Sequence, residues 1–245
     1  MPIYGAHGMA LLKDHLESGK PLEQIQLIGI DLSGMDFSGR SFKELSVSKS
    51  LLDGADFTDA AIEESIFEES NMKDVLFVGS RLQDTDVSSS ILLRAMMQEV
   101  RAFSCSFKRS YMQRLHIRKS MFCDCLFINI EAEKADAIES VFSSCDFRFD
   151  DSGGVTGFQE SVFQNCIFMD CTFEGFALTG VDMTGSVFIR CRFRVPDWED
   201  VETAGGHFFG CSGIPGWKEL SEPPALPLNH ENAAKELLQT LGSVQ

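Results

Sequence analysis

The chain carries an apolar residue at every fifth position over most of its length. From Leu27 to Phe147 this position is never polar, and after one interruption the same spacing runs from Phe158 to Phe193. A helix repeats about every 3.6 residues and a strand about every 2, so apolar residues at strict fives would spread round a helix and alternate between the faces of a strand. The period therefore indicates a repeat architecture.

A second position, two residues before each large one, is mostly occupied by a small residue. Examples are Ala55, Ser70, Ser90, Cys125 and Cys145. One large and one small residue in every five suggest a chain that turns a corner every five residues. Both side chains of each repeat would point inward, which leaves the other three positions for the surface.

The pattern is clearest in four repeats, which read Ala55-Asp56-Phe57-Thr58-Asp59, Ser70-Asn71-Met72-Lys73-Asp74, Ala135-Asp136-Ala137 and Cys145-Asp146-Phe147. In these the chain resembles the pentapeptide-repeat proteins, whose motif is commonly written A(D/N)LXX, and the resemblance covers roughly residues 25–195. It implies an all-β solenoid, a right-handed quadrilateral β-helix with four repeats per coil. About eight coils and short terminal helices are expected, which would make a rod on the order of 40 Å long.

Three parts are expected along the chain. Residues 1–24 contain an amphipathic stretch that predicts an N-terminal cap helix, and residues 25–194 form the β-helix. Within it, Phe147 and Phe158 are eleven residues apart, which we interpret as two repeats plus one residue, with a loop or bulge at 148–157. Residues 195–245 leave the period and are expected to form a C-terminal capping tail.

The tail contains a short predicted helix. Asn229 is a plausible N-cap, and Gly242 follows the last periodic residue. The apolar residues of this helix are Ala233, Ala234, Leu237, Leu238 and Leu241. They predict packing against the last coil of the same chain or, alternatively, a homodimer formed through the C-terminal region.

Coils of twenty residues predict which side chains stack. One column would consist of Cys105, Cys125 and Cys145 and continue to Cys166. A second column would consist of Cys171, Cys191 and Cys211. An aromatic column is expected from Phe107, Phe127, Phe147, Phe168 and Phe188. Because most of the eight cysteines fall at the small inward position, they are interpreted as core thiols of a reducing compartment.

Little in the sequence indicates catalysis. The five histidines are scattered, and no catalytic, cofactor or metal motif is present, so we expect no enzyme, no cofactor and no metal site. There is no signal sequence and no apolar run long enough to span a membrane, so a cytoplasmic location is expected; secretion as an effector without a signal peptide is also compatible. A net charge of -16 argues against direct nucleic-acid binding.

Function must then lie in the outward residues, whose charges are unevenly distributed. An acidic cluster comprises Asp53, Asp56, Asp59, Glu63, Glu64, Glu68 and Glu69. Seven basic residues follow between residues 94 and 119, and one predicted stacked row consists of Arg94, Arg114 and Lys134. We interpret both sets as candidate partner-binding surfaces.

Two functions fit this pattern. The first is a non-enzymatic scaffold that binds a protein partner through its charged faces, as a bacterial effector or adaptor. The alternative, implied by the resemblance, is a DNA mimic that binds DNA gyrase or another topoisomerase and inhibits or protects it. The basic band at mid-rod favours the scaffold, because a mimic of DNA should be negative along its whole length.

Overall fold

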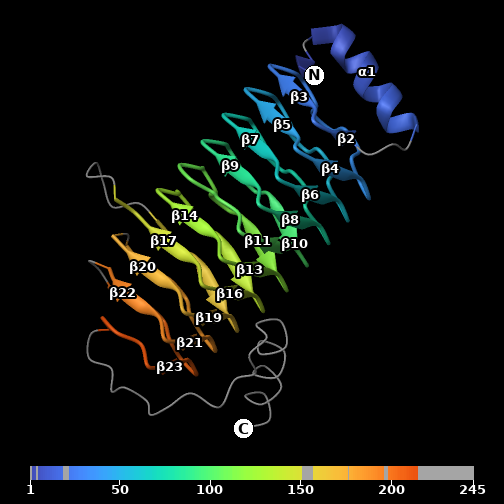
Figure 1. The fold of residues 1–245 in the computed structure, drawn as a ribbon. Coiled ribbons are helices and arrows are strands. Elements are labelled where there is room, and N and C mark those ends of the chain that lie inside the picture. Colours follow the sequence, from blue (N-terminus) through green and yellow to red (C-terminus); the bar gives the residue numbers. More distant parts are fainter. Residues whose placement is uncertain are drawn as a thin grey trace.

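The described residues form a parallel β-solenoid of about nine turns with one short helix (Figure 1). The computed structural model describes residues 2–3, 5–18, 22–150, 157–175, 177–195 and 198–214. Every fifth residue starts a new wall, and four walls complete one turn, so the predicted quadrilateral β-helix is confirmed, with about nine turns instead of eight. The right-handed winding stays a prediction.

Wall 1 is the longest sheet. Its strands are β2 (Leu22–Glu23), β4 (Ser41–Lys43), β6 (Ala61–Glu63), β8 (Arg81–Gln83), β11 (Arg101–Phe103), β13 (Met121–Cys123), β16 (Val141–Ser143), β19 (Ile167–Met169), β21 (Val187–Ile189) and β23 (His207–Phe209). Each strand pairs in parallel with the strand one turn away, so equivalent residues of successive turns lie side by side.

The next three walls follow in order. Wall 2 contains β1 (Pro2–Ile3), β3 (Gln26–Ile28), β5 (Ser46–Ser48), β7 (Ile66–Glu68) and β9 (Asp86–Ser88), then β14 (Leu126–Ile128), β17 (Asp146–Arg148), β20 (Thr172–Glu174) and β22 (Arg192–Arg194). Wall 3 is held by single bridges such as Leu51 with Asn71. Wall 4 starts with single bridges and continues as β10 (Met96–Gln98), β12 (His116–Arg118), β15 (Asp136–Ile138) and β18 (Val162–Gln164).

The predicted inward residues fill the tube. Phe57, Phe77 and Phe127 are 1%, 1% and 3% exposed. Between walls, the corner residue has a positive φ, as in Glu64 (50°) and Asp84 (49°), which turns the chain onto the next wall. The period of five therefore follows from two inward residues, two outward residues and one corner.

The small inward residues also satisfy buried polar groups. At the start of wall 3, Ser70, Ser90 and Ser110 each accept a hydrogen bond at Oγ from the backbone N–H of the serine one turn earlier, at 3.3, 3.1 and 3.4 Å. The hydroxyl of Ser90 in turn donates to the carbonyl of Phe67. Small polar residues thus line the tube without leaving unpaired donors.

Helix α1 (Gly5–Ser18) covers the first turn. Leu12 is buried in the same core cluster as Leu22 and Leu27, and Leu16 packs against that cluster. The guanidinium of Arg40 donates to the carbonyl of Leu16 at 2.6 Å, which explains an arginine at a position that is otherwise small. The helix therefore closes the open end of the solenoid.

The solenoid extends beyond both expected boundaries. Leu22 already pairs with Phe42 on wall 1, although the coils were expected to begin at residue 25. At the other end β23 pairs with β21, and Arg192 bridges to Ser212, although the tail was expected to leave the period at residue 195. The predicted C-terminal helix lies outside the described residues.

The interruption after Phe147 differs from the prediction. Asp136 pairs with Val162 and Phe147 with Phe173, so equivalent residues are twenty-six apart across this turn. Six residues are therefore inserted where we predicted one. Phe147 stacks on Phe173 (4.9 Å, 3°) and Phe168 on Phe142 (4.9 Å, 6°), so the predicted single column from Phe107 to Phe188 was wrong and two columns run side by side.

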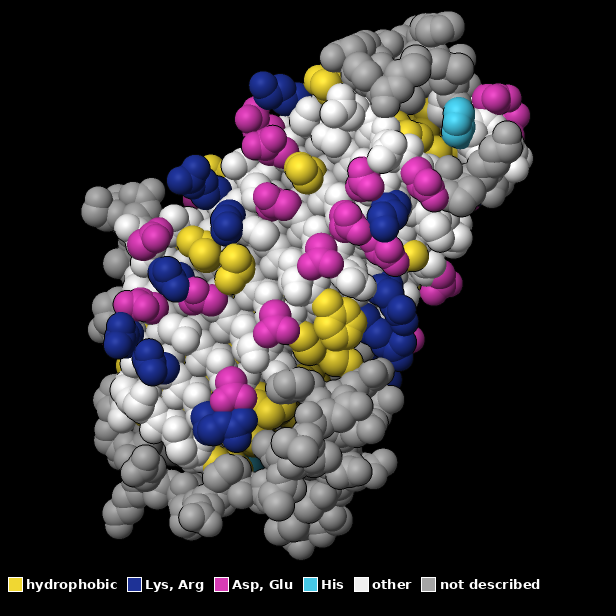
Figure 2. Space-filling view, viewed as in Figure 1, with side chains coloured by type: hydrophobic (Ala, Val, Ile, Leu, Met, Phe, Trp, Pro, Cys, Tyr) yellow, Lys and Arg dark blue, Asp and Glu magenta, His cyan; other side chains and the backbone are white. Residues whose placement is uncertain are grey.

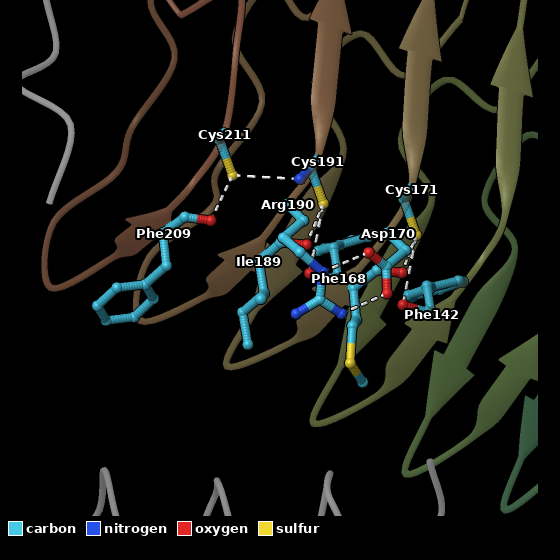
Figure 3. A network of polar contacts seen from close by, with 10 residues as sticks. Phe142, Phe168, Asp170, Cys171, Ile189, Arg190, Cys191, Phe209 and Cys211 are labelled. Atoms are coloured by element: carbon cyan, nitrogen blue, oxygen red, sulfur yellow. Dashed lines mark hydrogen bonds and ion pairs between the residues drawn. The ribbon is translucent and has the colours of Figure 1, made fainter. Parts of the chain in front are cut away.

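The same shift joins the cysteines into one ladder. The inward position at the start of wall 2 is occupied by Cys105, Cys125, Cys145, Cys171, Cys191 and Cys211. Cys166 does not continue this ladder as predicted, because it lies between Ser140 and Ser186 at the start of wall 1. Figure 3 shows three rungs, where Cys191 contacts the carbonyls of Phe168 and Ile189.

These cysteines are expected to resist modification in the folded chain. Burial raises the pKa of the Cys166 thiol to about 12 and also raises the pKa of Cys145. Because a maleimide must reach the thiol, we expect Cys211, which is the only one of the eight that is not buried, to react first at pH 8. All eight cysteines should react after unfolding. Peptide mass spectrometry at successive times measures the order, and labelling of Cys145 as early as Cys211 would contradict it.

Candidate functional site

The predicted acidic cluster winds round the solenoid. Asp53 lies on wall 3, Asp56 on wall 4, Glu63 on wall 1 and Glu68 on wall 2, and Asp59, Glu64 and Glu69 are corner residues with positive φ. The seven acids therefore form a belt and not a single patch. A flat partner can contact the acids on two adjoining walls, but not all seven.

The acids on walls 1 and 2 adjoin one another. Glu63 and Glu64 lead round the corner to Glu68 and Glu69. Glu64 lies 3.2 Å from Nζ of Lys43, and Glu69 lies 3.7 Å from Nζ of Lys49. Among the described residues, neither Glu63 nor Glu68 forms an ion pair. These four glutamates keep most of their charge toward solvent.

The corner between walls 1 and 2 adds two acids. Glu44, Glu64 and Asp84 stack on successive turns, so their carboxylates lie about 5 Å apart in the strand-pairing direction. Gln24 donates to Glu44 at 3.2 Å and Gln83 to Asp84 at 3.3 Å. We call the set Glu44, Glu63, Glu64, Glu68, Glu69 and Asp84 the acidic edge. Figure 2 shows acidic side chains dispersed over this part of the rod.

The acids on walls 3 and 4 make local hydrogen bonds. Oδ2 of Asp53 accepts from Nδ2 of Asn71 at 3.0 Å. Oδ1 of Asp56 accepts from the backbone N–H of Thr58 at 2.8 Å. On the same wall, hydrogen bonds from the hydroxyl and the backbone N–H of Ser38 lower the pKa of Asp36. These carboxylates stabilise the outer turns of the repeat as well as carrying charge.

The predicted basic row is largely neutralised within the chain. Arg94 makes two hydrogen bonds to Asp74, at 2.7 and 2.6 Å, and Lys134 lies 2.9 Å from Glu133 and 3.4 Å from Glu160. The hydrogen bond from Arg94 lowers the pKa of Asp74. Arg114, between these two pairs, has no ion pair within the described part of the chain.

Two further surface pairs lie on wall 4 and its adjacent corner. Nδ1 of His116 lies 2.6 Å from Oδ1 of Asp136, and Lys119 lies 3.9 Å from Glu139 on the adjacent corner. Such exposed pairs contribute about 0–1 kcal/mol each. They reduce the net charge of this wall, so wall 4 presents a weaker field than the acidic edge.

The described residues present charge at their surface, and their enclosed space is small and apolar. Two cavities, of about 20 and 10 Å³, are lined almost wholly by core side chains such as Phe127 and Leu27. Over the described ranges, no three His, Cys, Asp or Glu side chains come together to hold a metal ion. No helix in the described part is long and apolar enough to cross a membrane.

Sequence reasoning missed an outward apolar surface on wall 1. Val141, Ile167, Met169, Val187 and Ile189 form a cluster separate from the core, flanked by Met121 and Phe209. They occupy the positions on either side of the large inward residue, where most repeats have polar residues. The signal was therefore present in the outward positions, but the period of five draws attention to the inward ones.

Comparisons with known proteins agree with the fold. The family model for pentapeptide repeats matches eight copies, over residues 55–94 and 158–194. No curated protein matches the chain.

Several solved structures are similar to the chain, including QnrB1 and HetL. A trypsin-treated form of QnrB1, a plasmid-mediated fluoroquinolone resistance protein, is 12% identical with a TM-score of 0.46, and the match covers 77% of this chain and 92% of that one. HetL, a pentapeptide-repeat protein involved in heterocyst differentiation regulation in the cyanobacterium Nostoc sp. strain PCC 7120, is 13% identical with a TM-score of 0.32, covering 82% and 92%.

The five-residue repeat of the sequence corresponds to the four-walled solenoid of the structure. Large and small inward residues alternate with outward and corner residues along four walls, and the family model matches in both blocks of turns. Both blocks of turns therefore carry pentapeptide repeats, as the resemblance of the sequence implied.

Proposed function

We propose that the chain is a non-enzymatic scaffold, acting as an effector or adaptor, that binds a basic surface of a partner protein through the acidic edge. The observation that carries this proposal is the charge of adjoining walls 1 and 2, where Glu63 and Glu68 have no ion pair among the described residues. None of the eight cysteines, all of which are described, forms a disulfide, which is compatible with the reducing cytoplasm where we place this function.

The stacking of Glu44, Glu64 and Asp84 supports binding of a cationic partner. Two carboxylates about 5 Å apart repel by about 1 kcal/mol in water, and Lys43 offsets this for one of them. A partner that places lysine or arginine along the corner would relieve this repulsion. Because parallel pairing fixes the backbone of each wall, the loss of conformational freedom on binding falls on the glutamate side chains.

The DNA-mimic alternative fits the charge pattern less well. A mimic should present negative charge along the whole rod, whereas Lys108 on wall 2 and Arg109 on the next corner follow the acidic edge two turns later. Neither has an ion pair among the described residues. Binding to a topoisomerase therefore remains the second proposal, with basic residues such as Arg114 as a separate contact.

The test is a charge reversal of one edge in the full chain. We expect Glu63→Lys, Glu64→Lys, Glu68→Lys and Glu69→Lys together to reduce capture of the partner from the native host at least tenfold. Capture by the unmodified chain should fall steeply between 50 and 300 mM salt, because exposed charges are screened. Quantitative mass spectrometry of the captured proteins provides the measurement.

A matched control reverses four acids on the opposite walls, Asp31→Lys, Asp36→Lys, Asp53→Lys and Asp56→Lys, in the same turn of the rod and the turn before it. This variant should retain the partner, and circular dichroism checks that both variants fold. Equal loss in both would show that net charge, and not the acidic edge, determines capture. In parallel, inhibition of gyrase supercoiling by stoichiometric protein would favour the DNA mimic.

A further inference from the structure

Wall 1 changes character along the rod. Its early strands bury only their central residue, as in β4 and β8, whereas β16, β19 and β21 are buried at all three positions. The outward residues of these three strands are Val141, Ser143, Ile167, Met169, Val187 and Ile189. We call the five apolar members the apolar stripe. Figure 2 shows apolar side chains gathered on this side from about β11 and β13 onward.

The side chains of the apolar stripe point away from the core. In each strand the central phenylalanine, such as Phe168 or Phe188, occupies the tube, and neighbours in a strand project to the opposite face. The stripe accordingly forms a cluster distinct from the core. Parallel pairing aligns Ile167 with Val187 and Met169 with Ile189, so the stripe continues from turn to turn.

Stacking alone does not explain how deeply these residues are buried. Ile167 and Ile189 are 0% exposed, whereas the outward apolar residues Leu51 and Tyr111 on wall 3 are both 46% exposed. Neighbours on adjacent turns cover the flanks of an outward side chain but not its outer end. A layer from outside the solenoid walls must therefore cover the stripe.

We propose that the apolar stripe is the docking surface for the chain's own C-terminal segment, through the predicted helix at residues 229–241. The described coils end at Ile214 on wall 2, which adjoins wall 1 and therefore the stripe, and residues 215–245 follow this point in the sequence. The inserted loop is a poorer occupant, because it leaves the solenoid after Asp150, between walls 2 and 3.

The length of the predicted helix and its apolar side chains both fit the apolar stripe. A helix over residues 229–241 is about 20 Å long, and the five strands from β13 to β23 span about 19 Å. The residues between Ile214 and Asn229 can extend up to about 50 Å, which is ample to reach any part of the stripe. The helix offers small and branched apolar residues, Ala234, Leu237 and Leu241, to a surface of Val, Ile and Met.

Cys123 provides a reporter for the test. It lies on β13, at the outward position one turn from Ser143, and it is 6% exposed. We expect Leu237→Asp with Leu241→Asp, in the full chain, to increase the rate of maleimide labelling at Cys123 at least tenfold. Labelling of the core cysteine Cys145 should stay slow, which shows that the solenoid remains folded. Peptide mass spectrometry separates the two sites.

The matched control is Asn232→Asp with Gln239→Asp, which adds the same two carboxylates to the opposite side of the predicted helix. It should leave labelling at Cys123 unchanged. Protection of Cys123 that persists on hundredfold dilution, with a monomeric mass by light scattering, supports docking within one chain. Loss of protection on dilution, with a dimeric mass, would assign the stripe to a second copy and overturn the proposal, as would unchanged labelling in Leu237→Asp with Leu241→Asp.

Discussion

Replacing Phe127 by alanine is expected to lower the free energy of unfolding by about 3 to 5 kcal/mol. The ring is 3% exposed and is stacked between Phe107 (5.1 Å, 8°) and Phe147 (4.8 Å, 7°). It also meets Phe122 edge to face at 5.8 Å. The substitution removes contacts on both adjacent turns and enlarges a cavity of about 20 Å³ that this ring already lines. Equilibrium unfolding in urea, followed by circular dichroism, measures the change.

The matched control is Tyr111→Ala, which removes an outward aromatic ring that is 46% exposed. Its effect should stay within about 1 kcal/mol, because little buried area is lost. If both substitutions changed stability equally, the distinction between inward and outward positions would be wrong. Hydrogen exchange gives a second readout, since each turn contacts only its neighbours and the loss of protection should centre on the turns beside Phe127.

The period of five predicts which residues are buried, but not how turns align. Phe147 and Phe158 are eleven residues apart, which is one repeat plus six residues or two repeats plus one. Both readings keep the same inward positions, since one and six differ by a whole repeat. Only strand pairing across the insertion, such as Phe147 with Phe173, distinguishes them. The inward residues were therefore correct while the cysteine and aromatic columns beyond the insertion were wrong.

Charge clustering in the sequence has a similar limit. Asp53 and Glu63 are only ten residues apart in the sequence, yet they lie on opposite walls of the solenoid. Acids that follow one another within a single turn of twenty residues are consequently spread round the solenoid as a belt. A patch on one face requires residues that are about twenty positions apart in the sequence. Glu44, Glu64 and Asp84 meet this condition, which is why the acidic edge includes two residues from outside the predicted cluster.

The last turn was hidden by one polar residue. Trp198 and Phe208 continue the inward position and pack with the core, but Thr203 lies between them and interrupts the apolar series. Backbone bridging does not depend on that side chain, and Asp182 still bridges to Glu202. A pattern based on apolar residues alone therefore places the end of the coils too early.

Replacing Cys145 by aspartate is expected to destabilise the chain by more than about 4 kcal/mol. Cys145 is 2% exposed, between Cys125 and Cys171 in the ladder. Its Sγ lies 3.4 Å from the carbonyl of Phe122 and 3.5 Å from that of Ser143. A carboxylate at this position would face two carbonyl acceptors and have no cationic partner, so it would be a buried charge without a counter-ion. Urea unfolding measures the loss.

Serine at the same position separates this effect from a loss of volume. Three turns before Cys145, Thr85 occupies the same inward position at the start of wall 2. Its hydroxyl donates to the carbonyls of Ile62 (3.3 Å) and Gln83 (3.0 Å), which are equivalent to the two carbonyls beside Cys145. Cys145→Ser can adopt that arrangement and should cost about 1 kcal/mol or less. If aspartate were tolerated as well as serine, this position would have to be open to water. If serine were as damaging as aspartate, the ladder would require sulfur itself, since the hydroxyl satisfies the same carbonyls on other turns of this column.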